Sequence, residues 1–176
     1  TKTLELIDYD EQRRQQKVLR ESGVYMGIGV AYELTPEGGT LPGTLVAGYD
    51  TSTVKVDPSG FVTVLTGVTD PGGGNRTGIG QIVADALGVE FENVRILQGD
   101  TQACPYGFGN YSGRSTIVGG GSAALAAADI KAQIKMLAAA MMEVSEDSIE
   151  IYRGMVTTTA DPTAQLSFAE VCYAAY

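Results

Sequence analysis

Short stretches in which apolar and polar residues alternate mark the predicted strands of this chain. The clearest pair flanks the tetrapeptide Asp-Pro-Ser-Gly at residues 57–60, whose proline and glycine suit the special positions of a tight turn. This arrangement predicts an antiparallel hairpin. Strands are expected at residues 24–33, 53–56, 61–65, 94–97, 149–152 and 156–159, and a loop rich in proline and glycine at residues 36–43.

Apolar residues at helical spacing predict the helices. One helix presents Ile79, Ile82, Val83, Ala86 and Leu87 on a single face and ends at Gly88. The longest helix is expected at about residues 116–143, and its first half consists mainly of glycine, serine and alanine. Such small residues allow close packing against a neighbouring backbone or against a ligand.

The two ends of the chain also carry helix signals. Residues 4–21 predict a charged surface helix, with Asp8 and Glu11 as a capping box and Gly23 as the stop. A final helix is expected after Ser167, which has Glu170 three residues on.

The irregular alternation of these elements predicts an α+β fold. It combines mixed and antiparallel strands, hairpins and packed helices. Neither an internal repeat nor an inter-domain linker is evident, so residues 1–176 are expected to form one segment. A chain of 176 residues is long enough to bury about 70% of its unfolded surface.

Composition excludes several classes of function. A net charge of −9 disfavours nucleic acid as a partner, because phosphates would be repelled over most of the surface. The absence of histidine removes the commonest zinc ligand and the usual nucleophile-activating base. The two cysteines form no CxxC motif, and neither a signal peptide nor a membrane span is evident, so a cytoplasmic location is expected.

Two glycine-rich loops, at residues 70–77 and 107–121, share one design. In each, a strand ends, glycines follow and a helix begins, which exposes unpaired backbone N–H groups to an anion. An arginine in each loop could grip phosphate oxygens in a bidentate fork. The expected cofactor-binding residues are Gly72, Gly73, Gly74, Arg76, Thr77, Gly109, Ser112, Gly113, Arg114 and Ser115.

Plain tight turns are the alternative interpretation of both loops, because glycines before helices also serve that purpose alone. Neither loop contains the third glycine of the GxGxxG fingerprint, and the chain has no Gly-Lys pair for a Walker A motif. The residues therefore leave two readings open, a dinucleotide cradle and a pair of structural turns.

The order of the motifs resembles the molybdopterin-binding large subunit of the molybdenum hydroxylases, the xanthine dehydrogenase and aldehyde oxidase family. In detail the chain is most similar to the carbon monoxide dehydrogenase branch, and the resemblance covers nearly the whole chain. The motifs that carry it are Thr66-Gly67-x-x-Asp70-x-Gly72-Gly73-Gly74-x-x-Thr77, Gln81-Ile82-x-Ala84-x-x-Leu87-Gly88, Gly99-Asp100-Thr101, Pro105-x-Gly107-x-Gly109 and Arg114-Ser115.

The resemblance implies a cofactor and partners. Both glycine loops would help to hold a molybdenum pterin dinucleotide, usually the cytosine form in bacteria. The family's first loop reads Gly-Gln-Gly, and Gly73 stands here at the glutamine position. Iron–sulfur clusters and FAD would lie on partner chains or domains, and the partners would be the remaining large-subunit segments and the iron–sulfur and flavin subunits.

The resemblance also implies what this segment lacks. The family's substrate-activating glutamate lies in a Gly-Glu motif, and this chain has no such pair. We therefore expect no catalytic residue and no metal ligand here, and no hydroxylase activity from the isolated chain. The substrate of the complete enzyme would be carbon monoxide, an aldehyde or an N-heterocycle. The alternatives are a nonenzymatic interaction module that keeps the fold without cofactor and, third, an independent nucleotide-binding protein.

Overall fold

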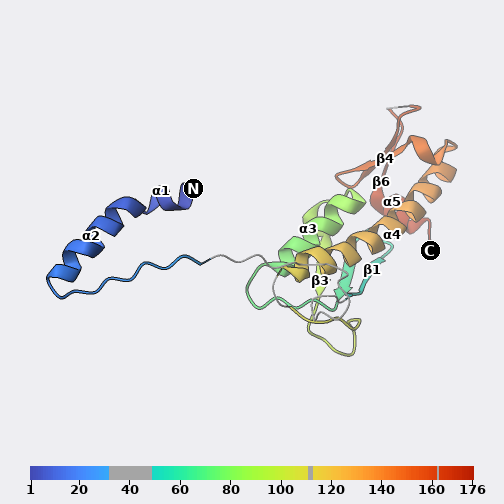
Figure 1. The fold of residues 1–176 in the computed structure, drawn as a ribbon. Coiled ribbons are helices and arrows are strands. Elements are labelled where there is room, and N and C mark those ends of the chain that lie inside the picture. Colours follow the sequence, from blue (N-terminus) through green and yellow to red (C-terminus); the bar gives the residue numbers. More distant parts are fainter. Residues whose placement is uncertain (32–48, 111–112, 162) are drawn as a thin grey trace. The chain divides into compact units, whose positions relative to one another are not determined.

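The structure is a computed structural model that describes residues 1–31, 49–110, 113–161 and 163–176. The chain divides into two compact units, Thr1–Leu34 and Thr35–Tyr176 (Figure 1). The predicted loop at residues 36–43 lies outside the described residues, and the assignment of residues 1–176 to one segment stays a prediction.

The first unit contains two helices where the sequence predicts one. Helix α1 (Lys2–Leu6) and helix α2 (Tyr9–Glu21) are separated at Asp8, which has a left-handed backbone with φ of 47°. A capping side chain needs an extended backbone, so the predicted capping box is wrong. Glu11 instead forms an ion pair with Arg14 at 2.7 Å.

The end of α2 follows the prediction, but the strand after it does not form. Gly23 adopts φ of 81°, and the Val24 N–H donates to the Leu19 carbonyl, which closes a Schellman motif. Residues 24–31 are mostly exposed and pair with no other strand among the described residues, so they do not form a strand. The last two residues of the predicted strand, 32 and 33, lie outside the described residues.

The second unit is built on a three-stranded sheet in the order β1-β2-β3. The predicted hairpin is confirmed: β1 pairs antiparallel with β2, and Asp57 closes the turn by accepting from the Ser59 N–H at 2.8 Å. Strand β2 pairs parallel with β3, so α3 is the crossover between them. The bounds are β1 (Ser52–Val56), β2 (Val62–Thr66), α3 (Asn75–Leu87), the 3₁₀ turn η1 (Phe91–Asn93) and β3 (Val94–Leu97).

The long helix completes the main core. It begins as a π-helical turn, η2 (Ser115–Gly119), and continues as α4 (Gly120–Met142). Helices α3 and α4 lie side by side, with α4 against β1 and α3 against β3 (Figure 1). The buried side chains between these layers include Val62, Val64, Val83, Leu87 and Ala127. The predicted small-residue stretch packs closely, because an added Cβ at Gly119 or Gly120 would collide with the Val68 or Ile82 side chain.

A second small sheet lies at the other end of α4. Its antiparallel order is β4-β5-β6, and the sequence predicts the first two of these strands. The predicted capping box of the last helix is confirmed, with Ser167 and Glu170 bonded reciprocally. The bounds are the 3₁₀ turn η3 (Glu146–Ser148), β4 (Ile149–Tyr152), β5 (Met155–Thr158), β6 (Gln165–Ser167) and α5 (Phe168–Tyr173). The two sheets and packed helices confirm the α+β class.

Candidate functional site

The topology brings the two glycine loops to one edge of the sheet. Strands β2 and β3 are parallel, so their carboxyl ends lie at the same edge. The first loop leaves β2 there and leads into α3, and the second leaves β3 and leads into η2 and α4. The two helices therefore begin close together and run side by side (Figure 1). Ligands of sheets with parallel strands bind preferentially outside such carboxyl ends.

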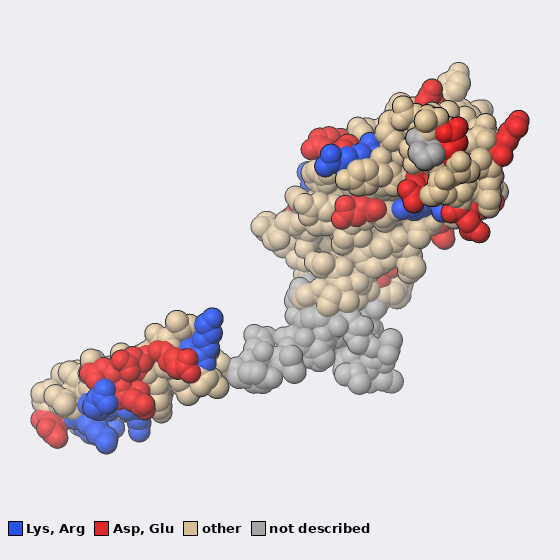
Figure 2. All heavy atoms as spheres, turned by 90° about the horizontal axis from the view of Figure 1, so that it is seen from above, with Lys and Arg blue, Asp and Glu red and all other residues tan. Residues whose placement is uncertain are grey.

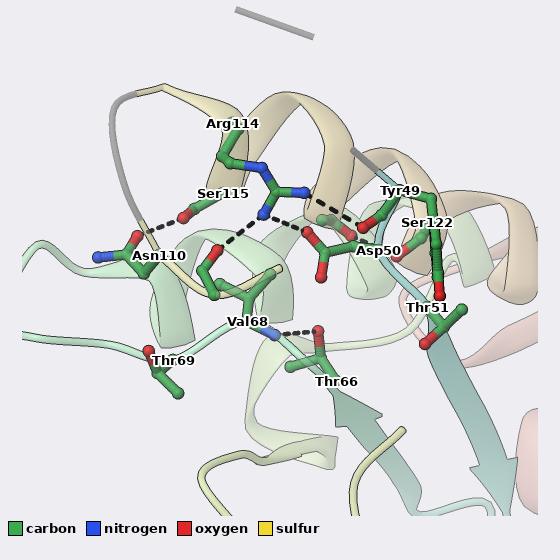
Figure 3. Close-up of polar contacts among 12 residues, drawn as sticks. Tyr49, Asp50, Thr51, Thr66, Val68, Thr69, Asn110, Arg114, Ser115 and Ser122 are labelled. Atoms are coloured by element: carbon green, nitrogen blue, oxygen red, sulfur yellow. Dashed lines mark hydrogen bonds and ion pairs between the residues drawn. The ribbon is translucent and has the colours of Figure 1, made fainter. Parts of the chain in front are cut away.

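A hydrogen-bonded link joins the loops directly. The Asn75 side-chain amide donates to the Thr69 carbonyl at 3.0 Å and to the Asn110 side-chain oxygen at 2.8 Å. The same Asn110 oxygen accepts from the Ser115 hydroxyl (Figure 3). Asn110 of the second loop is thereby connected to the first residue of α3 and to the first residue of η2, which holds the two helix starts close together.

The first loop is organised around Asp70. Its Oδ1 accepts from the N–H groups of Gly72 and Gly74 at 2.9 and 3.1 Å, and its Oδ2 accepts from the Arg76 N–H at 3.1 Å. Gly72 and Gly74 have φ of 110° and 84°, a backbone that favours glycine. No atom lies within 4 Å of an ideal Cβ at Gly72, Gly73 or Gly74, so this backbone is open to a ligand. Thr77 is exposed, and the exposed Arg76 donates to the Ile96 carbonyl at 3.2 Å.

The Asp70 contacts predict a pH dependence of this loop. Backbone hydrogen bonds from Arg76 and then Gly72 lower the pKa of the Asp70 carboxyl below its ordinary value. A lowered pKa in the folded state means that the carboxylate stabilises the loop fully above the unfolded pKa of about 3.9, and that this contribution is lost as pH falls through the lower, folded pKa. NMR titration should place the Asp70 midpoint below the ordinary range, together with shifts of the Gly72 and Gly74 amides. An ordinary midpoint would contradict this geometry.

The second loop is organised around a buried arginine. The Arg114 Nη1 lies 2.6 Å from Asp50 Oδ2, and both side chains are 0% exposed. Nη1 also donates to the Gly109 carbonyl at 2.7 Å, and Nη2 donates to the Tyr49 carbonyl at 3.2 Å (Figure 3). The guanidinium thus points into the protein, whereas the sequence predicts that it grips phosphate.

The other predicted residues of the second loop differ in exposure. Gly113 is exposed, and Gly109 is half-buried, with φ of 81° and no atom within 4 Å of its ideal Cβ. Ser115 is buried and bonded to Asn110. Ser112 lies outside the described residues. The open part of this loop is therefore backbone rather than charged side chain.

A hollow of about 330 Å³ lies beside the loops. Residues at the end of β2 and at the start of the second loop line it, and Gly67 and Gly107 in this lining pack backbone against backbone. Cys104 contributes a half-buried thiol that donates to the Leu97 carbonyl at 3.4 Å. The lining includes Thr66, Gly67, Thr69, Asp100, Cys104, Tyr106 and Gly107.

Charges are mixed over the surface. In the view of Figure 2, the second unit is mostly uncharged, with scattered Asp and Glu and a few Lys and Arg, and the first unit carries side chains of both signs. Within the described ranges no three His, Cys, Asp or Glu side chains gather to hold a metal ion. No helix in this part of the chain is long and apolar enough to cross a bilayer.

Sequence reasoning missed three residues of the site. Asn75 and Asn110 adjoin the loop glycines, but only the parallel pairing of β2 with β3 shows that they meet. Asp50 carries no local signal, because it lies far from Arg114 in sequence and pairs with it only in the fold.

Comparisons with known proteins agree with this architecture. A sequence model of the molybdopterin cofactor-binding domain matches residues 2–176. The chain is 31% identical to the nicotine 6-hydroxylase large subunit of Paenarthrobacter nicotinovorans, covering 98% of this chain and 22% of that protein. It is 32% identical to the carbon monoxide dehydrogenase large chain of Hydrogenophaga pseudoflava, covering 99% of this chain and 23% of that protein.

Solved structures show the same likeness. The quinoline 2-oxidoreductase of Pseudomonas putida 86 has a TM-score of 0.79 and 36% identity, over 98% of this chain and 22% of that one. A Cu,Mo-containing CO dehydrogenase has a TM-score of 0.77 and 30% identity, over 99% of this chain and 23% of that one. The chain therefore spans less than a quarter of the length of these relatives.

These matches confirm the resemblance to large subunits of the molybdenum hydroxylases, including the carbon monoxide dehydrogenase branch. Three observations lead to one assignment: the two glycine loops, their common position at one sheet edge and the family match over residues 2–176. The chain belongs to the molybdopterin cofactor-binding domain family.

Proposed function

We propose that this chain holds a molybdenum pterin dinucleotide, in its cytosine form, between its two glycine loops. The observation that carries the proposal is the Asn75–Asn110 hydrogen bond, which joins the loops at one sheet edge. The open glycine backbone at Gly72, Gly73, Gly74 and Gly109 fits a ligand that must approach closely, because a Cβ would fill that space. When bound, the molybdenum supplies oxygen-atom transfer and redox chemistry.

The two loops hold different parts of the cofactor in this proposal. Asp70 already accepts three N–H groups at the start of α3, so its negative charge disfavours a phosphate there. The first loop therefore contacts mainly neutral groups of the cofactor, with Arg76 and Thr77 at its margin. The second loop offers its backbone around Gly109 and Gly113 and the start of η2 to the pyrophosphate.

The chain acts as one part of a larger oxidoreductase. It matches less than a quarter of its relatives' length, so the catalytic base and metal-facing groups belong to other segments. We infer a small substrate of the carbon monoxide, aldehyde or N-heterocycle type, partner chains with iron–sulfur clusters and flavin, and a cytoplasmic location. The isolated chain should show no turnover with an artificial electron acceptor.

Cofactor content tests the proposal. The protein is purified with the subunits that remain bound, and molybdenum is measured by mass spectrometry of metals. Mild acid hydrolysis then releases the nucleotide for chromatography. We expect about one molybdenum and one cytidine monophosphate per chain. Protein that folds and carries neither supports the noncatalytic interaction module instead, and another nucleotide refutes the cytosine form.

A substitution at Gly73 should increase cofactor retention. Gly73 lacks the left-handed φ of its neighbours, and its ideal Cβ meets no atom within 4 Å. Gly73→Gln therefore restores the family's amide donor without strain, and we expect more molybdenum per chain at an unchanged melting temperature. Gly74→Gln is the matched control, because φ of 84° makes a side chain there cost about 1 kcal/mol or more. A destabilised Gly73→Gln protein with unchanged molybdenum content would reject this expectation.

A further inference from the structure

Three consecutive residues before β1 form a brace for the second glycine loop. We use "brace" for Tyr49, Asp50 and Thr51. The Thr51 hydroxyl donates to the Tyr106 carbonyl at 2.5 Å, near the start of the loop. The Tyr49 carbonyl and the Asp50 carboxylate contact Arg114, the last residue before η2 (Figure 3). The brace therefore contacts the chain just before Gly107 and again at Arg114.

The brace also contacts the first residues of the loop. Gly107 packs directly on Asp50, because an added Cβ at Gly107 would collide with Asp50 Oδ1. The Tyr49 ring meets the Phe108 ring edge-on, with centroids 5.4 Å apart. The Arg114 guanidinium lies 5.9 Å from the Phe108 ring centroid. The brace thus contacts the loop at Gly107, Phe108 and Arg114.

Arginine is specifically suited to this junction. Its planar guanidinium donates in fixed directions, and here it contacts a carboxylate and two backbone carbonyls at once. One of those carbonyls belongs to Gly109, whose open backbone faces the proposed cofactor space. The buried pair thereby determines where the Gly109 backbone lies. Fully buried ion pairs contribute little net stability but can specify one conformation.

We propose that Asp50 and Arg114 are positioning residues, whose buried ion pair holds the second glycine loop in the conformation that accepts the cofactor. This inference rests on the proposed function, and it assigns Arg114 an internal role in place of direct phosphate binding. Thr51 has the same role with a single hydrogen bond.

The test combines loop protection with cofactor retention. Asp50→Asn, Arg114→Lys and Thr51→Val are made in the protein as purified with its bound subunits. Hydrogen–deuterium exchange is followed at residues 106–110, and molybdenum content is followed during dialysis. Val156→Ala is the matched control, because its buried side chain belongs to β5 in the other sheet. Melting temperatures are measured for all four variants.

Asp50→Asn and Arg114→Lys are expected to accelerate both loop exchange and molybdenum loss by about tenfold to a hundredfold, the effect of a lost charge-assisted hydrogen bond. Thr51→Val should accelerate loop exchange and molybdenum loss by a smaller factor. If the other two variants do not fold, the Thr51→Val result tests the inference. Val156→Ala should lower the melting temperature without changing either readout. The inference would be overturned if Val156→Ala accelerated loop exchange as much as the Asp50 and Arg114 variants do. It would also be overturned if a variant with faster loop exchange retained molybdenum as well as the unmodified protein. If the unmodified protein contains no pterin, the proposed function fails, whereas unchanged loop exchange in the three variants refutes the brace itself.

Discussion

Replacement of Arg114 by alanine is expected to lower the free energy of unfolding by about 3–5 kcal/mol, because it leaves the buried Asp50 carboxylate without its counter-ion. The Asp50 side chain is 0% exposed, so its carboxylate is held away from bulk water when its partner is removed. The carbonyls of Tyr49 and Gly109 lose their donor as well. Urea denaturation of the variant and the unmodified protein measures the difference.

The double variant Asp50→Leu with Arg114→Met is the control for this prediction. It removes both charges and keeps similar volumes, so it should recover most of the lost stability. A single Arg114→Ala variant within about 1 kcal/mol of the unmodified protein would show that the pair is not buried as described. Equal losses in the single and double variants would show that packing, rather than charge, is responsible.

The Gly67→Ala substitution is expected to cost about 1–3 kcal/mol and to displace the second loop, because overpacking forces the backbone to move. An ideal Cβ at Gly67 lies 2.7 Å from the Gly107 Cα and 2.8 Å from its nitrogen, which are backbone atoms that cannot rotate away. Thermal denaturation measures the stability, and amide exchange at residues 106–110 measures the opening of the loop.

Gly78→Ala provides a matched control within α3. No atom lies within 4 Å of its ideal Cβ, and its φ is outside the left-handed region. Alanine has the higher helix propensity, so Gly78→Ala should stabilise the protein by about 0.5–1 kcal/mol. Similar losses at both glycines would contradict the backbone contact between Gly67 and Gly107.

The sequence predicted correctly those elements that depend on interactions between residues close together in the chain. The Asp57 turn, the glycine that ends α3 and the Ser167 capping box each depend on residues only a few positions apart. The α+β class followed from the same signals. The strand expected at residues 24–33 fails within its described part because a strand needs a hydrogen-bonded partner, which its own pattern cannot supply.

The site required tertiary information. The glycines of both loops were recognisable in the sequence, but the contact of Asn75 with Asn110 depends on the parallel register of β2 and β3. The orientation of Arg114 was not predictable, because a guanidinium at a helix start suits both a phosphate and a buried carboxylate. The partner that decides between them, Asp50, is distant in sequence.

Amide exchange of the protein with and without its cofactor tests the central claim, that both glycine loops hold one molybdenum pterin dinucleotide. The unmodified protein, purified with its bound subunits, is compared before and after the cofactor is removed. We predict that the cofactor protects residues 70–77 and 107–115 together, whereas β4 and β5 exchange equally in both states. Protection of neither loop, or of one loop alone, would contradict the claim.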